Sequence, residues 1–124
     1  MKLDILAFAA HPDDVELSAS GTLMKHIANG KKVGIVDLTQ GELGSRGTIQ
    51  TRYDEANKAS KLMGISYRNN LKMRDGFFTI SEENTLKIIS EIRKCQPAIV
   101  LMNAIDDRQS WKNKGFNIFL GITL

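Results

Sequence analysis

The sequence has little cysteine, no long apolar run and little net charge, and each of these shortages excludes a class of protein. The one cysteine, Cys95, cannot form a disulfide within the chain, which is typical of proteins of a reducing cytoplasm. A formal charge of +3, with scattered lysines and arginines, does not indicate a nucleic-acid surface. No apolar run is long enough to span a membrane. The 124 residues have room for one domain, which we expect to be cytoplasmic.

Apolar segments alternate with segments of helical spacing along the chain. The apolar run at the start is short and is interrupted by Asp4, so it predicts a strand rather than a signal peptide. Strands are predicted at 3–10, 33–39, 67–73 and 98–104. Helices are predicted at 15–29, 50–63 and 82–95. In the first helix, Leu17, Leu23 and Ile27 are the candidate core positions. This order predicts an α/β fold with a mostly parallel sheet and helices on its faces.

Polar loops follow three of the predicted strands. "HPDD" follows the first strand, "QGELGSRGT" the second and "NAIDDR" the fourth. In sheets of this kind, ligands bind beyond the carboxyl ends of the strands. We therefore expect the three loops to meet at one edge of the sheet and to form a site.

The first of these loops carries residues that suit a metal ion. The imidazole of His11 and the carboxylate of Asp14 are plausible zinc ligands. Asp13, between them, would then take a proton from water, whose pKa a bound metal lowers to roughly 7. The alternative is that Asp13 or Asp14 only caps the first helix.

Several segments in order resemble the PIG-L (LmbE-like) family of zinc-dependent N-acetylglucosamine deacetylases. "AHPDD" after the first strand resembles the family's signature, and "QGELGSRGT" with "TRYDEANKASKLMG" resembles its next segment. "LKMRDGFF" and "NAIDDR" are similar to its third-strand region and to the approach to its second metal motif. Within the family the bacillithiol-biosynthesis deacetylases are the most similar. The resemblance implies a Rossmann-like sheet and a hydrolase that deacetylates an N-acetylglucosaminyl conjugate such as a GlcNAc-malate.

The resemblance also implies roles for individual residues. His11 and Asp14 would bind zinc, and Asp13 would be the general base. Arg52 and Arg108 would bind the substrate, because a planar guanidinium suits sugar hydroxyls or a carboxylate. The alternative for Arg52 is a solvated helix residue.

Two further residues are weaker candidates. Glu42, in the second loop, either shapes the site or is an ordinary loop residue. His26 lies in the middle of a helix and is expected at the surface or in packing rather than as a ligand.

The chain departs from the family after Arg108. There the family continues as His-x-Asp-His-Gly, whose second histidine is the third zinc ligand and whose first polarises the substrate carbonyl. This chain has Gln109, Ser110 and Trp111 instead, and no histidine after His26. Deleting a block of bases that is not a multiple of three from the motif's codons gives Gln-Ser-Trp. We therefore divide the chain into residues 1–108, the N-terminal part of a deacetylase domain, and 109–124, a tail hypothesised to be frame-shifted. A gene deletion and a sequencing artefact would both give this result.

This departure leaves competing functions open. The first is a deacetylase acting on a small N-acetylglucosaminyl substrate, with homo-oligomerisation open for the full-length form. The second is an inactive, truncated remnant whose fold is incomplete at the C-terminus and whose fourth strand is left uncovered. A nucleotide-binding Rossmann module is disfavoured, because the first turn is acidic rather than G-x-G-x-x-G and acids repel phosphate.

Overall fold

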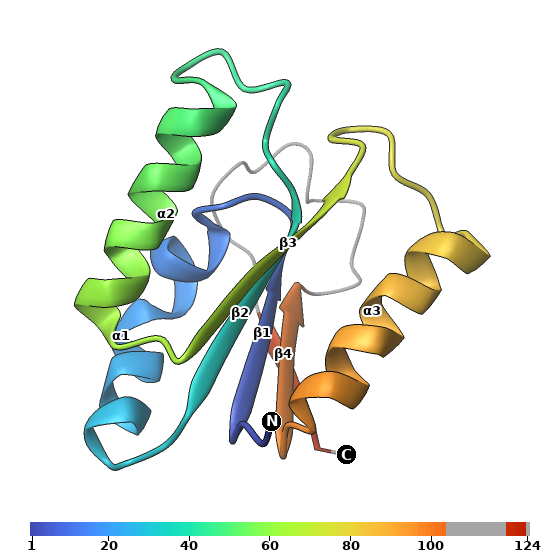
Figure 1. Ribbon diagram of the computed structural model, residues 1–124. Helices are drawn as coiled ribbons and strands as arrows, with labels where there is room; N and C mark the ends of the chain where they lie inside the picture. Colours follow the sequence, from blue (N-terminus) through green and yellow to red (C-terminus); the bar gives the residue numbers. More distant parts are fainter. Residues whose placement is uncertain (104–118, 124) are drawn as a thin grey trace.

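A five-stranded sheet in the order β3-β2-β1-β4-β5 forms the centre of the computed structural model, which describes residues 1–103 and 119–123 (Figure 1). The strands are β1 (Ile5–Ala9), β2 (Val33–Thr39), β3 (Tyr67–Met73), β4 (Ile99–Asn103) and β5 (Phe119–Thr123). The helices are α1 (Asp14–Ala28), α2 (Ile49–Met63) and α3 (Glu82–Cys95). The first four strands pair in parallel, which confirms the predicted α/β sheet.

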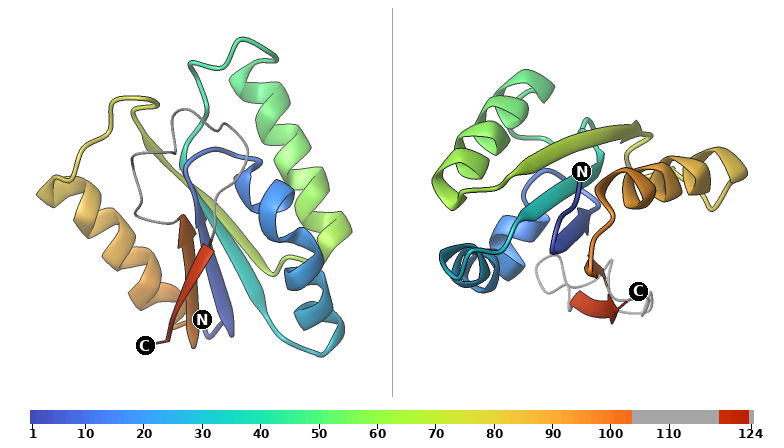
Figure 2. Two further views of the ribbon diagram at one scale, coloured as in Figure 1. Left: turned by 180° about the vertical axis from the view of Figure 1, so that it is seen from behind. Right: turned by 60° about the horizontal axis from the view of Figure 1, so that its bottom comes forward.

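The core lies on both faces of the sheet, because β1 is buried on both sides. Ile5, Ala7 and Ala9 belong to the cluster beneath α1 and α2. Leu6 and Phe8, which alternate with them, belong to the cluster beneath α3. Figure 2 shows these two layers of helices on opposite sides of the sheet. A strand so enclosed holds the loop that follows it in a fixed place.

The exposure of Leu17 corrects one core prediction. Its side chain is 80% exposed, whereas Val15 and Leu23 are fully buried. Ala19 and Ile27 pack partly buried against the same cluster. The inward face of α1 therefore runs in steps of four residues from Val15, and Leu17 lies two positions out of step with it.

Local capping residues set the ends of the other two helices. Thr48 caps α2 and forms a capping box with Thr51, and Gly64 ends the helix in the left-handed conformation. Ser81 caps α3 by accepting a hydrogen bond from the backbone of Asn84. Across the described ranges, none of the helices combines the length and apolarity needed to cross a bilayer.

Strand β5 pairs with the edge of β4 that faces away from β1. The two strands are antiparallel, with Ile99 opposite Thr123 and Asn103 opposite Phe119. This pairing gives β4 a neighbour on the side away from β1, and Ile99, Leu101 and Met102 remain partly exposed. Arg108 and the Gln109–Trp111 segment, on which the frame-shift hypothesis depends, lie outside the described residues.

Candidate functional site

The loop after β1 forms a tight turn around His11. The backbone N–H groups of Asp13 and Asp14 donate to the His11 carbonyl, at 2.8 and 3.3 Å. In return, the N–H of His11 donates to Asp14 Oδ2 at 3.0 Å. These bonds bring His11 Nδ1 to 3.6 Å from Asp14 Oδ2. Asp13 occupies the N-cap position of α1, but its side chain makes no capping hydrogen bond. Helix capping therefore does not account for the Asp13 carboxylate.

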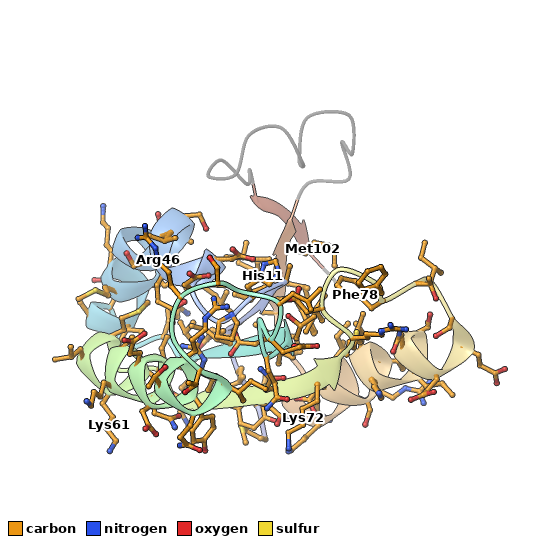
Figure 3. The ribbon with its side chains drawn as sticks, turned by 90° about the horizontal axis from the view of Figure 1, so that it is seen from above. His11, Arg46, Lys61, Lys72, Phe78 and Met102 are labelled. Atoms are coloured by element: carbon orange, nitrogen blue, oxygen red, sulfur yellow. The ribbon has the colours of Figure 1, made fainter. Side chains whose placement is uncertain are left out.

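The other ring nitrogen of His11 is bound by a residue that the sequence analysis did not identify. His11 Nε2 donates to Oδ1 of Asp75, at 2.8 Å. Asp75 follows β3, and its side chain is buried. Figure 3, which looks onto the carboxyl ends of the strands, shows His11 near the middle of this edge. An acid after a parallel strand, as in the "RDG" segment after β3, signals a site just as "HPDD" does, and this signal could have identified Asp75.

Asp75 is held in place by the loop after β2. Its Oδ2 accepts a hydrogen bond from the backbone of Leu43, at 3.1 Å. Its own backbone N–H donates to Glu42 Oε1, at 2.7 Å. The loops after β1, β2 and β3 therefore meet at one edge. Asn103, the first residue of "NAIDDR", is the last residue of β4, and the rest of this segment lies outside the described residues.

The two carboxylates change the protonation of His11. Its interaction with Asp14 raises the pKa, partial burial lowers it, and the bond to Asp75 raises it, giving a pKa of about 9. Burial alone would raise the pKa of Asp75. The hydrogen bonds from Leu43 and His11 outweigh burial and lower it below its ordinary value. Without a metal, these contacts favour the protonated form of the His11 ring at neutral pH.

Arg52 reaches the same loop from the first turn of α2. Its Nη2 lies 3.4 Å from Asp13 Oδ2, and its Nη1 donates to the Gly41 carbonyl at 3.0 Å. Gly41 has a φ of +63°, and a β-carbon there would lie 1.9 Å from the Arg52 guanidinium. The side chain of Arg52 is mostly buried, so it is not the solvated helix residue of the alternative interpretation.

The residues present fit part of a zinc site. Two ligands of a tetrahedral zinc ion, bound at about 2.0–2.2 Å, lie roughly 3.4 Å apart. His11 Nδ1 and Asp14 Oδ2 match this spacing at 3.6 Å, and an imidazole with a carboxylate is a suitable donor set. Within residues 1–103 and 119–123, no three histidine, cysteine or acidic side chains form a group able to hold an ion.

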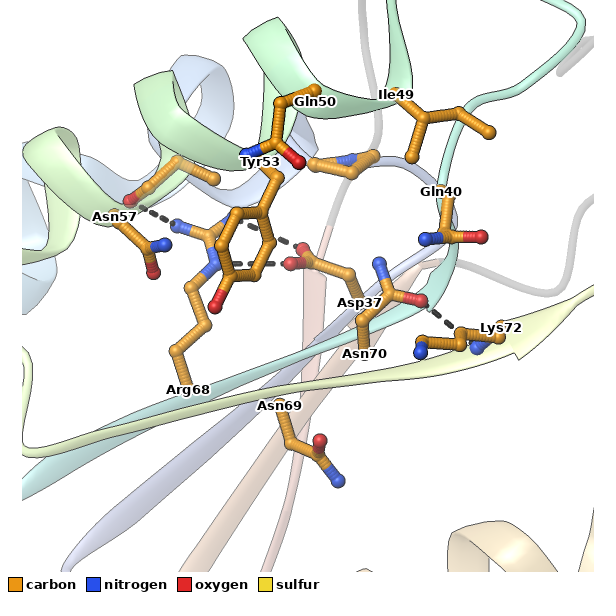
Figure 4. Close-up of a pocket in the computed structure, with 12 residues that line it drawn as sticks. Asp37, Gln40, Ile49, Gln50, Tyr53, Asn57, Arg68, Asn69, Asn70 and Lys72 are labelled. Carbon is orange, nitrogen blue, oxygen red and sulfur yellow. Dashed lines mark hydrogen bonds and ion pairs between the residues drawn. The ribbon is translucent and has the colours of Figure 1, made fainter.

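A cavity of about 430 Å³ lies beside the site, between α2 and β3 (Figure 4). It is lined by Pro12, Asp37, Gln40, Ile49, Gln50, Tyr53, Ala56, Asn57, Arg68, Asn69, Asn70 and Lys72. The lining includes Pro12 of the "HPDD" loop, but neither His11 nor Asp14. The cavity thus adjoins the His11 loop without containing the two predicted ligands.

A buried arginine joins four elements at the wall of this cavity. Arg68 donates from Nε and Nη2 to the two carboxylate oxygens of Asp37, at 2.9 and 3.0 Å. Its Nη1 pairs with Glu16 and donates to Ser60 Oγ at 3.1 Å and to the Ala56 carbonyl at 3.2 Å. Burial raises the pKa of Asp37 despite this pairing. The network ties β3 to β2, α1 and α2 beneath the loops of the site.

The structure thus brings His11, Asp13, Asp14 and Arg52 together at one edge of the sheet. Arg108 lies outside the described residues. His26 is exposed on α1, away from this edge.

Comparison with known proteins identifies related sequences over most of the chain. The family described as "PIG-L: GlcNAc-PI de-N-acetylase" matches residues 6–113. The uncharacterized deacetylase YaiS of Escherichia coli K12 is 30% identical over 92 residues, covering 74% of this chain and 49% of YaiS. The diacetylchitobiose deacetylase of Thermococcus kodakarensis is 28% identical over 105 residues, covering 79% of this chain and 39% of that enzyme.

A solved structure with the same fold is the conserved protein TT1542 from Thermus thermophilus. It superposes with a TM-score of 0.80 at 42% identity, covering 86% of this chain and 48% of that one. The chain therefore spans about half the length, or less, of the relatives it matches.

Proposed function

This chain belongs to the PIG-L family, and we propose that it is the N-terminal part of a zinc-dependent deacetylase. Its substrate would be an N-acetylglucosaminyl conjugate of the bacillithiol-precursor type, such as a GlcNAc-malate. The observation that carries the proposal is the 3.6 Å spacing of His11 Nδ1 and Asp14 Oδ2 in the loop after β1. The names of two relatives, a deacetylase and a diacetylchitobiose deacetylase, support the reaction class.

In this proposal His11 and Asp14 would hold the metal, and Asp13 would move the proton. Bound zinc supplies Lewis-acid activation of water and of the amide carbonyl. The Asp13 side chain is about half exposed, and Arg52 holds one of its oxygens at 3.4 Å. Asp13 therefore accepts a proton from the attacking water. It returns the proton to the amine as the C–N bond breaks and acetate is released.

The substrate contacts would come from Arg52 and Arg108. Arg52 already lies beside Asp13, so a sugar bound to it would place its acetamido group near the proton acceptor. The role of Arg108 rests on the family resemblance alone. We propose the cytoplasm as the compartment, because the one cysteine, Cys95, is buried and unpaired.

A second candidate is a chain without chemistry of its own. One observation favours it: within residues 1–103 and 119–123, His11 and Asp14 provide two ligands, where catalytic zinc sites normally have three. In that case His11 and Asp14 would hold zinc too loosely for turnover.

Zinc titration by calorimetry, paired with an assay of acetate release from a GlcNAc-malate, tests the proposal. We expect His11→Ala to abolish zinc binding and the matched control His26→Ala to leave it unchanged. Asp13→Asn should retain zinc and reduce acetate release by about 10²–10⁴-fold. Zinc binding that survives His11→Ala would contradict the proposed centre.

A second comparison separates the two candidates. The 124-residue chain should release acetate far more slowly than the same chain with the His-x-Asp-His-Gly frame and the remaining half of the domain restored. The longer chain gains a third ligand and an oxyanion donor, and one such donor is worth about 10²-fold or more in rate. Measurable acetate release by the 124-residue chain would favour the first candidate, and release by the longer chain alone would favour the inert remnant.

A further inference from the structure

We propose that Asp75 is a positioning residue that orients the His11 ring for metal binding. The inference rests on the proposed function, because the metal site is part of that function. Asp75 is 5% exposed and lies 64 positions along the chain from His11. Its Oδ1 accepts a hydrogen bond from His11 Nε2, at 2.8 Å. The bond links the ring, which follows β1, to the loop that follows β3.

This hydrogen bond determines which ring nitrogen is available to a metal. A carboxylate can only accept, so the bond keeps a proton on Nε2, and Nδ1 is the nitrogen that would give up its proton to a metal. Nδ1 is also the nitrogen that lies 3.6 Å from Asp14 Oδ2. A histidine that donates its second N–H to a carboxylate is the usual arrangement behind a metal ligand.

Packing alone does not hold the ring in this orientation. The side chain of His11 is 42% exposed, so its rotation is restrained mainly by its polar contacts. The Asp75 side chain is 7% exposed, and its second oxygen is fixed by the backbone of Leu43 at 3.1 Å. The carboxylate is thus the rigid partner and the imidazole is the group that it orients.

A purely structural role for Asp75 is the alternative. The Asp75 region also links two loops, because its backbone N–H donates to Glu42 Oε1 at 2.7 Å. A residue that only links the loops would affect the stability of the fold. A positioning residue affects the metal affinity and the tautomer of His11.

Metal titrations of four proteins distinguish these roles. Zn²⁺ or Co²⁺ is titrated into the unaltered chain and into Asp75→Asn, Asp4→Asn and Glu42→Gln, after circular dichroism has shown that each is folded. Asp4→Asn removes the same charge at the opposite end of β1. Glu42→Gln weakens the loop contact and keeps the bond between Asp75 and His11. We expect Asp75→Asn to weaken metal binding about 10–100-fold and the two controls to leave it unchanged.

Long-range ¹H–¹⁵N NMR of His11 in the zinc-loaded chain is the second measurement, and it needs no variant. The expected pattern is a protonated Nε2 with zinc on Nδ1. Zinc on Nε2, or unchanged affinity in Asp75→Asn, would overturn the inference while leaving the metal centre standing. If Glu42→Gln weakened metal binding equally, Asp75 would have only a structural role in linking the two loops. If the unaltered chain binds no metal, the centre of the proposed function fails together with the inference.

Discussion

Replacing Arg68 by methionine is expected to destabilise the fold, because the change leaves two inward-facing carboxylates without their cation. The side chains of Arg68, Asp37 and Glu16 are 9%, 4% and 17% exposed. Methionine has a similar length and retains much of the packing of the arginine stem. The loss therefore measures the uncompensated charges rather than a cavity.

The expected size of this loss is about 3–5 kcal/mol in the free energy of unfolding at neutral pH, the usual cost of breaking a buried ion pair from one side. The upper part of the range is favoured here. Arg68 contacts both oxygens of Asp37 and one oxygen of Glu16, so its removal takes the cation from both carboxylates. Arg46→Met, at an exposed arginine, removes the same charge and should change stability by less than about 0.5 kcal/mol.

The loss should also depend on pH in a defined direction. Burial already raises the pKa of Asp37 in the presence of Arg68, and removing the cation raises it further. An acid whose pKa is higher in the folded than in the unfolded state favours folding at low pH, and this advantage disappears as pH rises through the folded-state pKa. The difference between the variant and the unaltered chain is therefore smallest near the ordinary pKa of an aspartate, about pH 4, and widens toward neutral pH.

Urea denaturation followed by circular dichroism, at several pH values, measures this difference. A loss in the free energy of unfolding below about 1 kcal/mol at pH 7 would contradict the prediction, because it would show that water solvates the two carboxylates once Arg68 is removed. A loss of the same size at every pH would refute the account based on charge.

Two paired substitutions test other parts of the structure. Leu23→Ala should lower the free energy of unfolding by about 2–5 kcal/mol, because Leu23 is fully buried. Leu17→Ala should lower it by less than about 0.5 kcal/mol, because that side chain is 80% exposed. Equal losses in urea denaturation would contradict the assigned inward face of α1. Gly41→Ala should cost more than Gly30→Ala, because both glycines have a positive φ but only at Gly41 would a β-carbon collide with Arg52. Equal losses would show that Arg52 moves aside freely.

The sequence by itself determined the α/β class, the parallel pairing and the place of the "HPDD" loop. These features depend on local signals: the period of apolar residues, the helix caps and the turn residues between them. Because His11, Asp13 and Asp14 are neighbours in one short loop, their proximity follows from the chain itself. The parallel order also indicated that the loop after β2 would lie near them, and Leu43 of that loop does bind Asp75, the partner of His11.

Other features were decided only by the tertiary structure. The outward position of Leu17 depends on how α1 is rotated about its axis against the sheet. The spacing of apolar residues in this helix is compatible with more than one face of the helix packing on the sheet. The contact between His11 and Asp75 joins residues that are 64 positions apart. Strand β5 pairs with β4 in the antiparallel direction, whereas the other strands of the sheet are parallel. Such contacts depend on strand register and on the directions in which distant loops leave the sheet. No local pattern in the sequence encodes these quantities, because packing of the whole core sets them.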